Sequence, residues 1–469
     1  MNYVILLSVV LIFASCSTKE AAEQPPNIII IFTDDQGYED VGVFGSPDIE
    51  TENLDKMASE GIRLTSFYAA QAVCSASRAA LLTGCYPNRV GIHQAFMPGT
   101  SRGLLEEETT LAEMLKPLGY STAIFGKWHL GDTINNLPLA EGFDEYYGIP
   151  YSNDMWPYHP QQESFNFGPL PLYEGNNIID TLTDQSFLTT AITERSVEFI
   201  RKNRDNPFFL YVAHPQPHVP LFVSDKFRGK SDRGLYGDVI MEIDWSVGQI
   251  LSTLKNEGID NNTLVIFTSD NGPWLSYGDH AGSAGPFREG KGTGFEGGHR
   301  EPFIARWPGN LPEGETIETP VMAIDILPTI AHITNADLPD LPIDGKNVWP
   351  VLNGSTTESP QPAYFFYYRV NELFAVRSGN WKMYFPHRYR TLNGRPGGTG
   401  GLPAPYDYIQ LEDTLLYNLA EDPSETFDRY GEFPEVEQRL IELGDSIRHE
   451  LGDRLTGIEG VGSRDYNSR

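Results

Sequence analysis

The sequence predicts an α/β protein: a large, mainly parallel sheet flanked by helices, followed by a smaller C-terminal α+β subdomain that carries an antiparallel sheet. Up to about residue 360, apolar runs typical of buried strands alternate with helical patterns, which indicates a parallel sheet covered on both faces. Beyond that point, short aromatic runs at turn spacing indicate antiparallel strands. With 469 residues, 40% of them hydrophobic, the chain can bury such a core.

The first strand is predicted at "NIIIIFT" (27–33), an apolar run that ends at "DDQG". A short helix follows in "TENLDKMASEG", with Thr51 as its cap and Gly61 at its end. Further strands are predicted at "STAIFGKW", "PFFLYVAH" and "NTLVIFTSD", and each also ends in polar residues. Helical patterns lie near 109–118, 184–203 and 235–257. Because ligands gather at the carboxyl ends of parallel strands, a site is expected at these polar ends.

The last part of the chain has a different residue pattern. "AYFFYYR", "LFAVRSG" and "NWKMYFP" predict short antiparallel strands, followed by a Gly/Pro-rich loop at 391–407 and a terminal helix at roughly 433–451. The expected organisation is a signal segment at 1–16, a tether at 17–26, a main domain at 27–360 and a C-terminal subdomain at 361–469.

The N-terminus is predicted to be a targeting segment. "VILLSVVLIFA" (4–14) is apolar but too short to span a bilayer, which is typical of the hydrophobic core of a signal peptide. It runs into "FASC", which resembles the lipobox of bacterial lipoproteins with Cys16 as the lipid-bearing residue. A plain secretory signal is the alternative, because no Lys or Arg precedes the apolar run and Phe13 stands where an aliphatic residue is usual. Both alternatives predict an exported protein of a bacterium, periplasmic or at the outer membrane and cell surface. With the lipobox, membrane contact is expected only through the N-terminal lipid anchor.

The charge balance excludes some partners. With 34 basic and 64 acidic residues, the net charge is -30, and such a field repels nucleic acid and anionic membrane surfaces. An anionic substrate would be repelled too, unless positive charge is concentrated in one pocket. The acidity elsewhere on the chain disfavours long polyanionic chains as partners.

Cysteine usage argues against a disulfide framework. If Cys16 is lipidated or removed, only Cys74 and Cys85 remain. They lie eleven positions apart across a predicted helix, which argues against their pairing. Cys85 is most simply a small buried apolar residue, whereas Cys74 needs another explanation.

Two acidic pairs end two of the predicted strands: Asp34-Asp35 and Asp270-Asn271. Three carboxylates and one amide oxygen suit a hard cation, calcium first and magnesium second. Asp and Asn are also common in turns. Their shared position after buried strands favours the metal site.

Basic residues follow the other strand ends. "FGKWHLG" places Lys127 and His129 on one side of the backbone, where they can bind an anion and relay a proton. "HPQPHVP" supplies His214 and His218, and "REGKGTGFEGGHREP" supplies Lys291 in a Gly-rich loop, which often holds oxyanions. A solvated Lys and a hydrogen-bonded His remain the alternative for any isolated pair.

The strongest single signal is "CSASRAALLTG" (74–84). It resembles the maturation signature of type I sulfatases, in which a C-x-[P/A]-x-R core followed by L-T-G directs oxidation of the cysteine to formylglycine; Ala76 stands where proline is commoner. "FTDDQGY", "GKWHLG", "GIPYSND", "TSDNGP" and "GKGTGFEGGHREP" also occur in the order of that family, over about 27–330. The resemblance is closest to the arylsulfatase A group, and the last third shares only the general texture.

The resemblance implies an alkaline-phosphatase-like fold, a calcium ion, and hydrolysis of sulfate monoesters by a formylglycine that a formylglycine-generating maturase makes from Cys74. By the same resemblance, the calcium ligands are Asp34, Asp35, Asp270 and Asn271, with residue 74 near the ion. Arg78 and Lys127 hold the aldehyde hydrate, and Lys127, Lys291, Ser152 and His218 contact the substrate. His129 is the base and His218 the acid beside the leaving oxygen. His214 has no counterpart and stays outside the catalytic set.

Sulfated carbohydrate is the expected substrate, by analogy with exported bacterial sulfatases. Candidates for the sugar pocket are Asp154, Trp156, Tyr158, His159, Trp274, His280, Arg288, His387 and Arg388. A phosphonate monoester or phosphodiester hydrolase of the same superfamily is the first alternative. The second is a non-catalytic glycan-binding surface lipoprotein, which predicts the loss of at least one catalytic side chain; all of them are present.

Overall fold

The computed structural model describes residues 25–464. The predicted signal at 1–16, its lipobox residue Cys16, and residues 17–24 of the predicted tether lie outside the described residues. Within 25–464, none of the helices combines the length and the apolar character that a membrane span requires.

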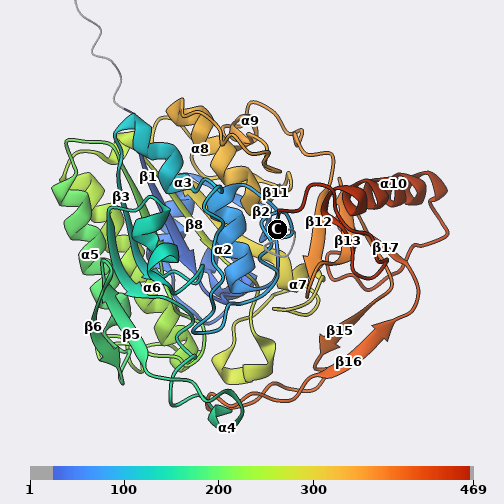
Figure 1. Ribbon diagram of the computed structural model, residues 1–469, viewed down its shortest axis with the longest axis horizontal. Helices are drawn as coiled ribbons and strands as arrows, with labels where there is room; N and C mark the ends of the chain where they lie inside the picture. The colour runs from blue at the N-terminus through green and yellow to red at the C-terminus, as the bar shows by residue number, and fades with distance from the viewer. Residues whose placement is uncertain (1–24, 465–469) are drawn as a thin grey trace, which may run out of the picture.

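An eleven-stranded sheet forms the centre of the main domain (Figure 1). Its order is β10-β2-β9-β8-β1-β7-β3-β4-β5-β6, and β11 pairs with β2. The strands are β1 (Asn27–Thr33), β2 (Ile62–Tyr68), β3 (Ser121–Lys127), β4 (Glu145–Ile149), β5 (Leu170–Glu174), β6 (Asn177–Leu182), β7 (Phe208–Ala213), β8 (Thr263–Ser269), β9 (Arg300–Arg306), β10 (Glu315–Ile317) and β11 (Val321–Met322). The run β8-β1-β7-β3-β4 is parallel throughout, whereas β9, β5 and β6 are antiparallel to their neighbours. The predicted, mainly parallel sheet is confirmed.

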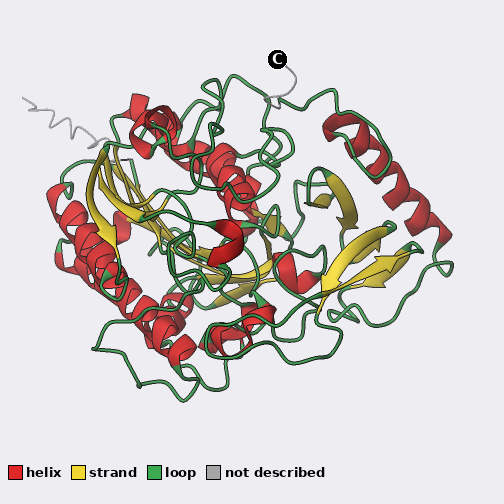
Figure 2. Ribbon diagram, turned by 60° about the horizontal axis from the view of Figure 1, so that its bottom comes forward, coloured by secondary structure: helices red, strands yellow, loops and turns green. Residues whose placement is uncertain are grey.

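Helices cover both faces of this sheet, as Figure 2 shows. One face carries α1 (Glu52–Ser59), α5 (Leu188–Lys202) and α6 (Leu235–Asn256), and the other carries α2 (Cys74–Thr83), α3 (Leu111–Leu115), α8 (Ile326–Thr334) and α9 (Trp349–Leu352). Strand β1 shows why its sequence is apolar without interruption: Ile28 and Ile30 pack on the side of α2, while Ile29 and Ile31 pack on the side of α5 and α6. A strand buried on both faces has no polar side to alternate with.

Two local predictions need correction. The helical pattern at 109–118 is only a five-residue α3, because Pro117 follows and the chain continues as a 3-10 turn over Lys116–Leu118. Thr51 precedes α1 as predicted, but its hydroxyl does not cap the helix. It accepts a hydrogen bond from Gly42 N at 2.8 Å and donates to Asp55 Oδ1 at 3.2 Å.

The C-terminal part contains the predicted antiparallel sheet. Four strands pair in the order β12-β13-β14-β17, and two further strands, β15 and β16, form a separate ribbon. Their bounds are β12 (Tyr364–Tyr368), β13 (Glu372–Ser378), β14 (Trp381–Tyr384), β15 (His387–Thr391), β16 (Asp407–Leu411) and β17 (Leu415–Asn418), and the terminal helix is α10 (Pro434–Leu451). This part joins the main domain through buried polar contacts: Lys382 Nζ lies 2.8 Å from Glu296 Oε1, in the short helix α7 (Glu296–His299).

Candidate active site

The two acidic pairs meet at the carboxyl edge of the sheet. Thr33 of β1 pairs with Ser269 of β8, so the residues that follow each strand are neighbours. Asp35 N donates to Asp270 Oδ1 at 3.1 Å, and Asn271 Nδ2 donates to Asp35 Oδ1 at 2.7 Å. Asp35 has a φ of 62°, a left-handed conformation that is costly for a residue with a Cβ and that clusters at functional sites.

Helix α2 begins at Cys74, directly above these carboxylates. The Cys74 Sγ lies 3.5 Å from Asp34 Oδ1 and 3.3 Å from Lys291 Nζ. One helical turn later, the fully buried Arg78 reaches the same place, because residues four apart share a helix face. Its Nη2 donates to Asp34 Oδ2 at 3.1 Å and to Asp270 Oδ2 at 3.0 Å. The four-residue spacing of the sequence signature therefore has a geometric purpose: it brings the thiol and the guanidinium to one carboxylate, Asp34.

Two buried lysines complete the group of cations. Lys127, the last residue of β3, contacts the carboxylate of Asp34, and its Nζ lies 3.3 Å from Ser152 Oγ. Lys291 Nζ lies 2.5 Å from Asp35 Oδ1 and 4.7 Å from the centre of the Trp274 ring. Each lysine thus contacts one carboxylate of the Asp34-Asp35 pair.

Two histidines differ in their hydrogen bonds. His129, with a φ of 61°, has Nε2 at 2.9 Å from the carbonyl oxygen of Phe96, so Nε2 carries the proton. Its buried Nδ1 has no hydrogen-bond partner among the described residues. Burial and the nearby Lys127 hold the pKa of His129 well below its usual value, so the ring is neutral with a free lone pair at Nδ1.

His218 has Nδ1 at 2.5 Å from the carbonyl oxygen of Val219 and Nε2 at 3.5 Å from Asp35 Oδ2. It therefore faces the carboxylates from the loop after β7. His214 lies elsewhere: its Nε2 is 3.3 Å from Ser246 Oγ of α6, and burial lowers its pKa to about 4.

The buried ionisable groups of the site shift one another's pKa values. Burial disfavours the carboxylate form of Asp34, but Lys127, His218 and Arg78 outweigh it and hold the pKa of Asp34 below the ordinary range. Burial and the neighbouring Asp34 raise the pKa of Asp270 to about 7. Burial and Asp34 also raise the pKa of the Cys74 thiol far above its usual value. An unmodified Cys74 is therefore a neutral thiol, which is a poor nucleophile.

The donor atoms fit a divalent cation. Asp34, Asp35, Cys74 and His218 each offer a ligand atom, and these atoms lie within 4.8 Å of one another. Asp35 Oδ2 and Asn271 Oδ1 are buried oxygens without a hydrogen bond among the described residues. Buried oxygens of this kind need a partner, and a set of carboxylate and amide oxygens matches the preference of a hard cation. Asp270 belongs to the group through the amide of Asp35 and through Arg78.

A cavity of about 400 Å³ lies beside Trp274, whose ring centre is 5.5 Å from that of His218. One wall comes from the segment after Ser152 and from α4 (Gln162–Phe165), and another from the chain around β15 and β16. The lining includes Asp154, His159, Trp274, Arg390, Tyr406 and Tyr408.

The other candidates for the sugar pocket do not line this cavity. Trp156 is buried and packs edge-on against Phe222 at 5.6 Å, and Tyr158 is 63% exposed. His387 is buried and stacks on Phe374 with ring centres 3.9 Å apart. The guanidinium of Arg288 covers the ring of Phe295 at 4.0 Å. Neither His280 nor Arg388 is among the lining residues.

Sequence reasoning missed Arg390 and Tyr406. Arg390 of β15 donates to the carbonyl oxygen of Lys291 through Nε at 3.0 Å and through Nη2. Tyr406 lies near the end of the Gly/Pro-rich loop (391–407), and its ring centre is 4.7 Å from the Arg390 guanidinium carbon. Composition marks this segment only as a loop, so no local signal points to either residue.

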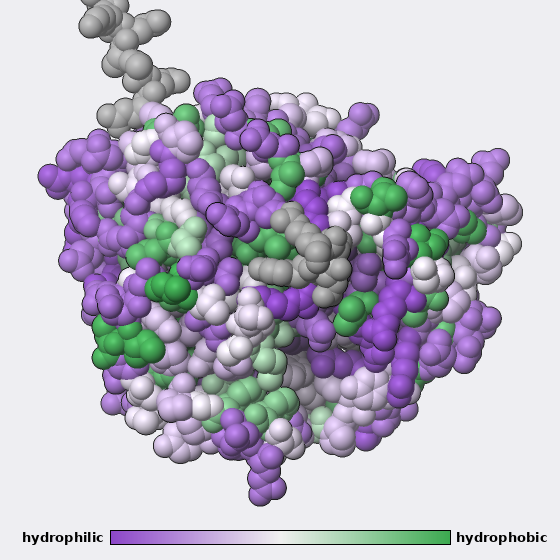
Figure 3. All heavy atoms as spheres, in the orientation of Figure 1, coloured by the Kyte–Doolittle hydropathy of each residue, from purple (hydrophilic) through white to green (hydrophobic). Residues whose placement is uncertain are grey.

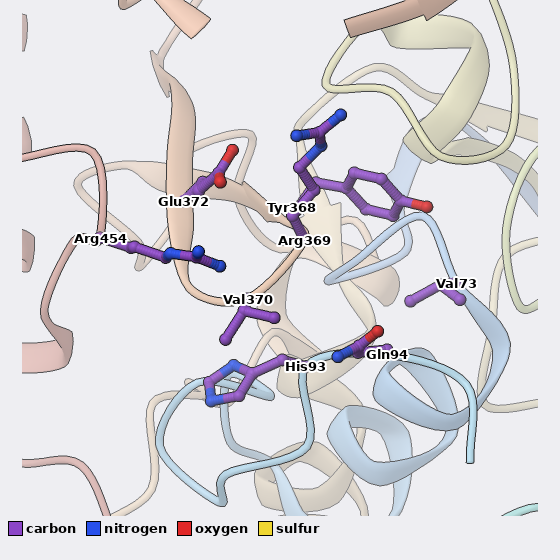
Figure 4. Close-up of a pocket in the computed structure, with 8 residues that line it drawn as sticks. All are labelled: Val73, His93, Gln94, Tyr368, Arg369, Val370, Glu372 and Arg454. Atoms are coloured by element: carbon purple, nitrogen blue, oxygen red, sulfur yellow. The ribbon is translucent and has the colours of Figure 1, made fainter. Parts of the chain in front are cut away.

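A second cavity, of about 350 Å³, opens between the segment before α2 and the β12–β13 turn (Figure 4). Its lining residues are Val73, His93, Gln94, Tyr368, Arg369, Val370, Glu372 and Arg454, and none of them is a predicted catalytic residue. Figure 4 shows Arg454 extending toward Val370, whereas the Arg369 side chain points away from His93.

Comparison with known proteins identifies the family. The sulfatase family model matches residues 26–336, and a model of the C-terminal region of aryl-sulfatase matches residues 360–453. Arylsulfatase A of Bos taurus is 39% identical over 447 residues, which cover 90% of this chain and 87% of that protein. N-acetylgalactosamine-6-sulfatase of Rattus norvegicus is 39% identical over 433 residues, covering 87% and 82%.

Solved structures agree with the sequence relatives. The crystal structure of the PsFucS1 sulfatase from Pseudoalteromonas sp. superposes with a TM-score of 0.81 at 28% identity, covering 90% of each chain. The alkaline-phosphatase-like fold expected from the sequence is thereby confirmed. The chain belongs to the sulfatase family and is a sulfuric ester hydrolase.

Proposed function

We propose that the enzyme hydrolyses sulfate monoesters of carbohydrates, with a formylglycine made from Cys74 as its nucleophile and a calcium ion as its metal. The observation that carries the proposal is the position of residue 74. It is the first residue of α2 and is buried among charged side chains, with its Sγ within 3.5 Å of both Asp34 Oδ1 and Lys291 Nζ. A nucleophile at this position faces a concentration of positive charge that suits a sulfate ester.

Asp34, Asp35, Asp270 and Asn271 would hold the calcium ion, with magnesium as second choice. The ion would neutralise sulfate charge and stabilise the charge that develops on oxygen. The two buried oxygens without partners, Asp35 Oδ2 and Asn271 Oδ1, support this assignment.

A hydrated aldehyde at position 74 would supply one hydroxyl to attack sulfur and a second hydroxyl for the later release of sulfate. In this structure residue 74 is a cysteine, and its Sγ stands for those hydroxyl oxygens. The raised pKa of the Cys74 thiol argues against the unmodified side chain as the nucleophile, because the thiol is not ionised at neutral pH. A formylglycine-generating maturase is the partner that this chemistry requires.

The cations would bind the substrate and hold the nucleophile. Arg78 and Lys127 both contact Asp34, next to Cys74, and would orient the hydrate. Lys127, Lys291, Ser152 and His218 surround the same space and would bind the sulfate oxygens. Fixed donors of this kind stabilise charge in a site that excludes water.

Two histidines would move the protons. Neutral His129 would accept a proton at Nδ1, where its lone pair is free. Because Nδ1 of His218 donates to the Val219 carbonyl oxygen, His218 would have to be an imidazolium, facing Asp35, to hold at Nε2 the proton that the leaving oxygen takes up. The two rings thus divide the roles of base and acid, as the different partners of their nitrogens allow.

The cavity beside Trp274 supports a carbohydrate substrate. Aromatic rings offer faces for sugar stacking, and Asp154 Oδ1 is buried without a hydrogen-bond partner among the described residues, so it can accept from a hydroxyl. The relative N-acetylgalactosamine-6-sulfatase bears the name of a sulfated sugar. Export with a lipid anchor at Cys16 would place the enzyme where polysaccharide fragments are found.

Hydrolysis of an aryl sulfate, measured beside an aryl phosphodiester and an aryl phosphonate, tests the reaction. We expect sulfate release to be fastest, and much faster diester or phosphonate cleavage would favour the alternative enzyme. Mass spectrometry of the peptide that contains residue 74 tests the nucleophile. Active enzyme with an unmodified thiol there would overturn the proposed mechanism.

A further inference from the structure

The β15–β16 ribbon has two different faces. His387 and Tyr389 point inward and are buried, while Arg388 and Arg390 alternate with them on the outer face. Arg390 pairs in register with Tyr408, so arginine and tyrosine side chains occupy the same outer face. This face borders the cavity beside Trp274, because Arg390 and Tyr408 line it.

Cationic groups continue from the catalytic pocket along this face. The Arg390 guanidinium carbon lies 6.0 Å from the ring centre of Trp274, the ring that Lys291 also contacts. Farther out, the guanidinium carbons of Arg388 and Arg369 lie 4.9 Å and 6.0 Å from the ring centre of Tyr408. We call Arg369, Arg388 and Tyr408 the outer arginine cluster.

The two arginines of this cluster are not neutralised by ion pairs. Neither Arg369 nor Arg388 has a carboxylate oxygen within 4.0 Å among residues 25–464. Nearby Arg395, in contrast, pairs with Asp407 at 3.0 Å. Glu372 lines the cavity of Figure 4 together with Arg369, but it is buried, and burial raises its pKa although Arg369 and Arg454 oppose the shift.

Arg369 and Arg388 thus share the ring of Tyr408 without an ion pair, in a chain that has 64 acidic and 34 basic residues. Figure 3 shows a predominantly hydrophilic face of the molecule. Charged side chains on such a face are hydrated or paired with side chains of opposite charge. A guanidinium that rests on an aromatic ring keeps its N–H donors directed outward, where they can bind a sulfate or carboxylate in bidentate fashion. The geometry therefore points to an anion as the missing partner.

We propose that the outer arginine cluster binds a second anionic group of the substrate, a sulfate ester or a carboxylate. This inference rests on the proposed carbohydrate substrate: the sugar would lie in the 400 Å³ cavity, with its reacting sulfate toward Lys291 and its second anion toward Arg388 and Arg369. The enzyme would then select saccharides that carry at least two negative charges, despite its own net charge of -30.

Competitive inhibition of aryl sulfate hydrolysis tests the cluster without knowledge of the natural sugar. Inorganic sulfate probes the catalytic pocket alone, whereas a persulfated disaccharide can reach both places. We expect Arg388→Gln with Arg369→Gln to raise the Ki of the persulfated disaccharide about tenfold more than the Ki of sulfate. The same comparison is made with a monosulfated disaccharide that contains a hexuronate. A similar increase of its Ki in the double variant would show that a carboxylate can replace the second sulfate.

The matched control is Arg439→Gln, an exposed arginine of α10 that lines neither cavity. The deciding quantity is the Ki for the persulfated disaccharide divided by the Ki for inorganic sulfate. If the double variant changes this ratio no more than Arg439→Gln does, the proposal is wrong. Failure of the wild-type enzyme to hydrolyse any aryl sulfate would count against the proposed function instead. The persulfated disaccharide can still be measured in that case by calorimetric titration of both proteins, and equal affinities would overturn the second-anion site.

Discussion

Arg390 holds the backbone of Lys291. Two N–H groups of its guanidinium donate to the Lys291 carbonyl oxygen, and the amine of that lysine lies 2.5 Å from Asp35 Oδ1. Strand β15 thus positions a cation of the proposed catalytic site from 99 residues away in the chain.

Replacement of Arg390 should therefore act through Lys291. We expect Arg390→Met to lower kcat for an aryl sulfate about tenfold to a hundredfold, because a misplaced catalytic cation loses most of its value. Arg390→Lys should recover little, since a single ammonium cannot make the paired contact. Steady-state kinetics beside Arg439→Met, a surface change, would measure this; wild-type kcat in Arg390→Met would exclude the positioning role.

Replacement of His129 should separate the two halves of the proposed reaction. If its Nδ1 acts as the base for sulfate release, His129→Ala should lower kcat by at least about a hundredfold and trap sulfate on residue 74. Rapid mixing with an aryl sulfate should then show a burst of phenol equal to the enzyme concentration. Mass spectrometry of the quenched protein would reveal the adduct, and a slow variant with neither burst nor adduct would assign His129 a different role.

Removal of the metal should destabilise the protein as well as inactivate it. A chelator should lower the thermal midpoint, and added calcium should restore it, because an ion that binds only the folded chain adds about 2.7 kcal/mol at a hundredfold excess over its Kd. Magnesium should restore less. Asn271→Ala should weaken the calcium-dependent shift by removing one oxygen ligand. A midpoint that responds to neither chelator nor calcium would argue against a metal site at these residues.

Acid should destabilise the protein through its buried neutral histidines. Burial lowers the pKa of His214 and His387 from 6.5 to about 4, so between those values the unfolded chain binds more protons than the folded chain. The free energy of unfolding should therefore fall as the pH drops from 6.5 to 4, by roughly 3 kcal/mol for His214 alone.

Urea denaturation at a series of pH values would measure this dependence. His214→Gln should flatten the slope of the unfolding free energy against pH, whatever its effect on absolute stability, while exposed His449→Gln should leave the slope unchanged. An unchanged slope in His214→Gln would contradict the prediction.

The sequence predicts this fold, and which side chains gather at the carboxyl edge of the sheet, because both depend largely on local patterns. β1 and β8 are continuous apolar runs, and the polar residues that follow them must meet because the strands are parallel neighbours. The Cys74–Arg78 spacing fixes one face of α2. The apolar runs and the spacing are local features, whereas the pairing of β1 with β8 is a long-range contact of which the sequence predicts only the shared edge of the sheet.

The cavity wall from the C-terminal subdomain could not be predicted in the same way. His387 and Arg390 both lie in β15, yet His387 stacks in the core and Arg390 reaches Lys291. Which face of a short strand turns inward depends on how the ribbon docks, and a shift of one residue would exchange the two. A helical pattern also does not reveal where a helix ends or what its first residues bind. Helix α3 ends before Pro117, and the Thr51 hydroxyl binds Gly42 N of the neighbouring loop and does not cap α1.

The burial of Cys74 has a consequence for the order of events in the life of the protein. Its side chain is 2% exposed, beneath the Gly-rich loop that carries Lys291 and inside a helix that begins at this residue. A modifying enzyme cannot reach a side chain that is buried in this way, so the proposed oxidation would have to precede the docking of α2 onto the sheet. A molecule that folds before this oxidation would keep an unmodified, inaccessible Cys74. The active fraction of a preparation would then depend on the rate of modification relative to the rate of folding.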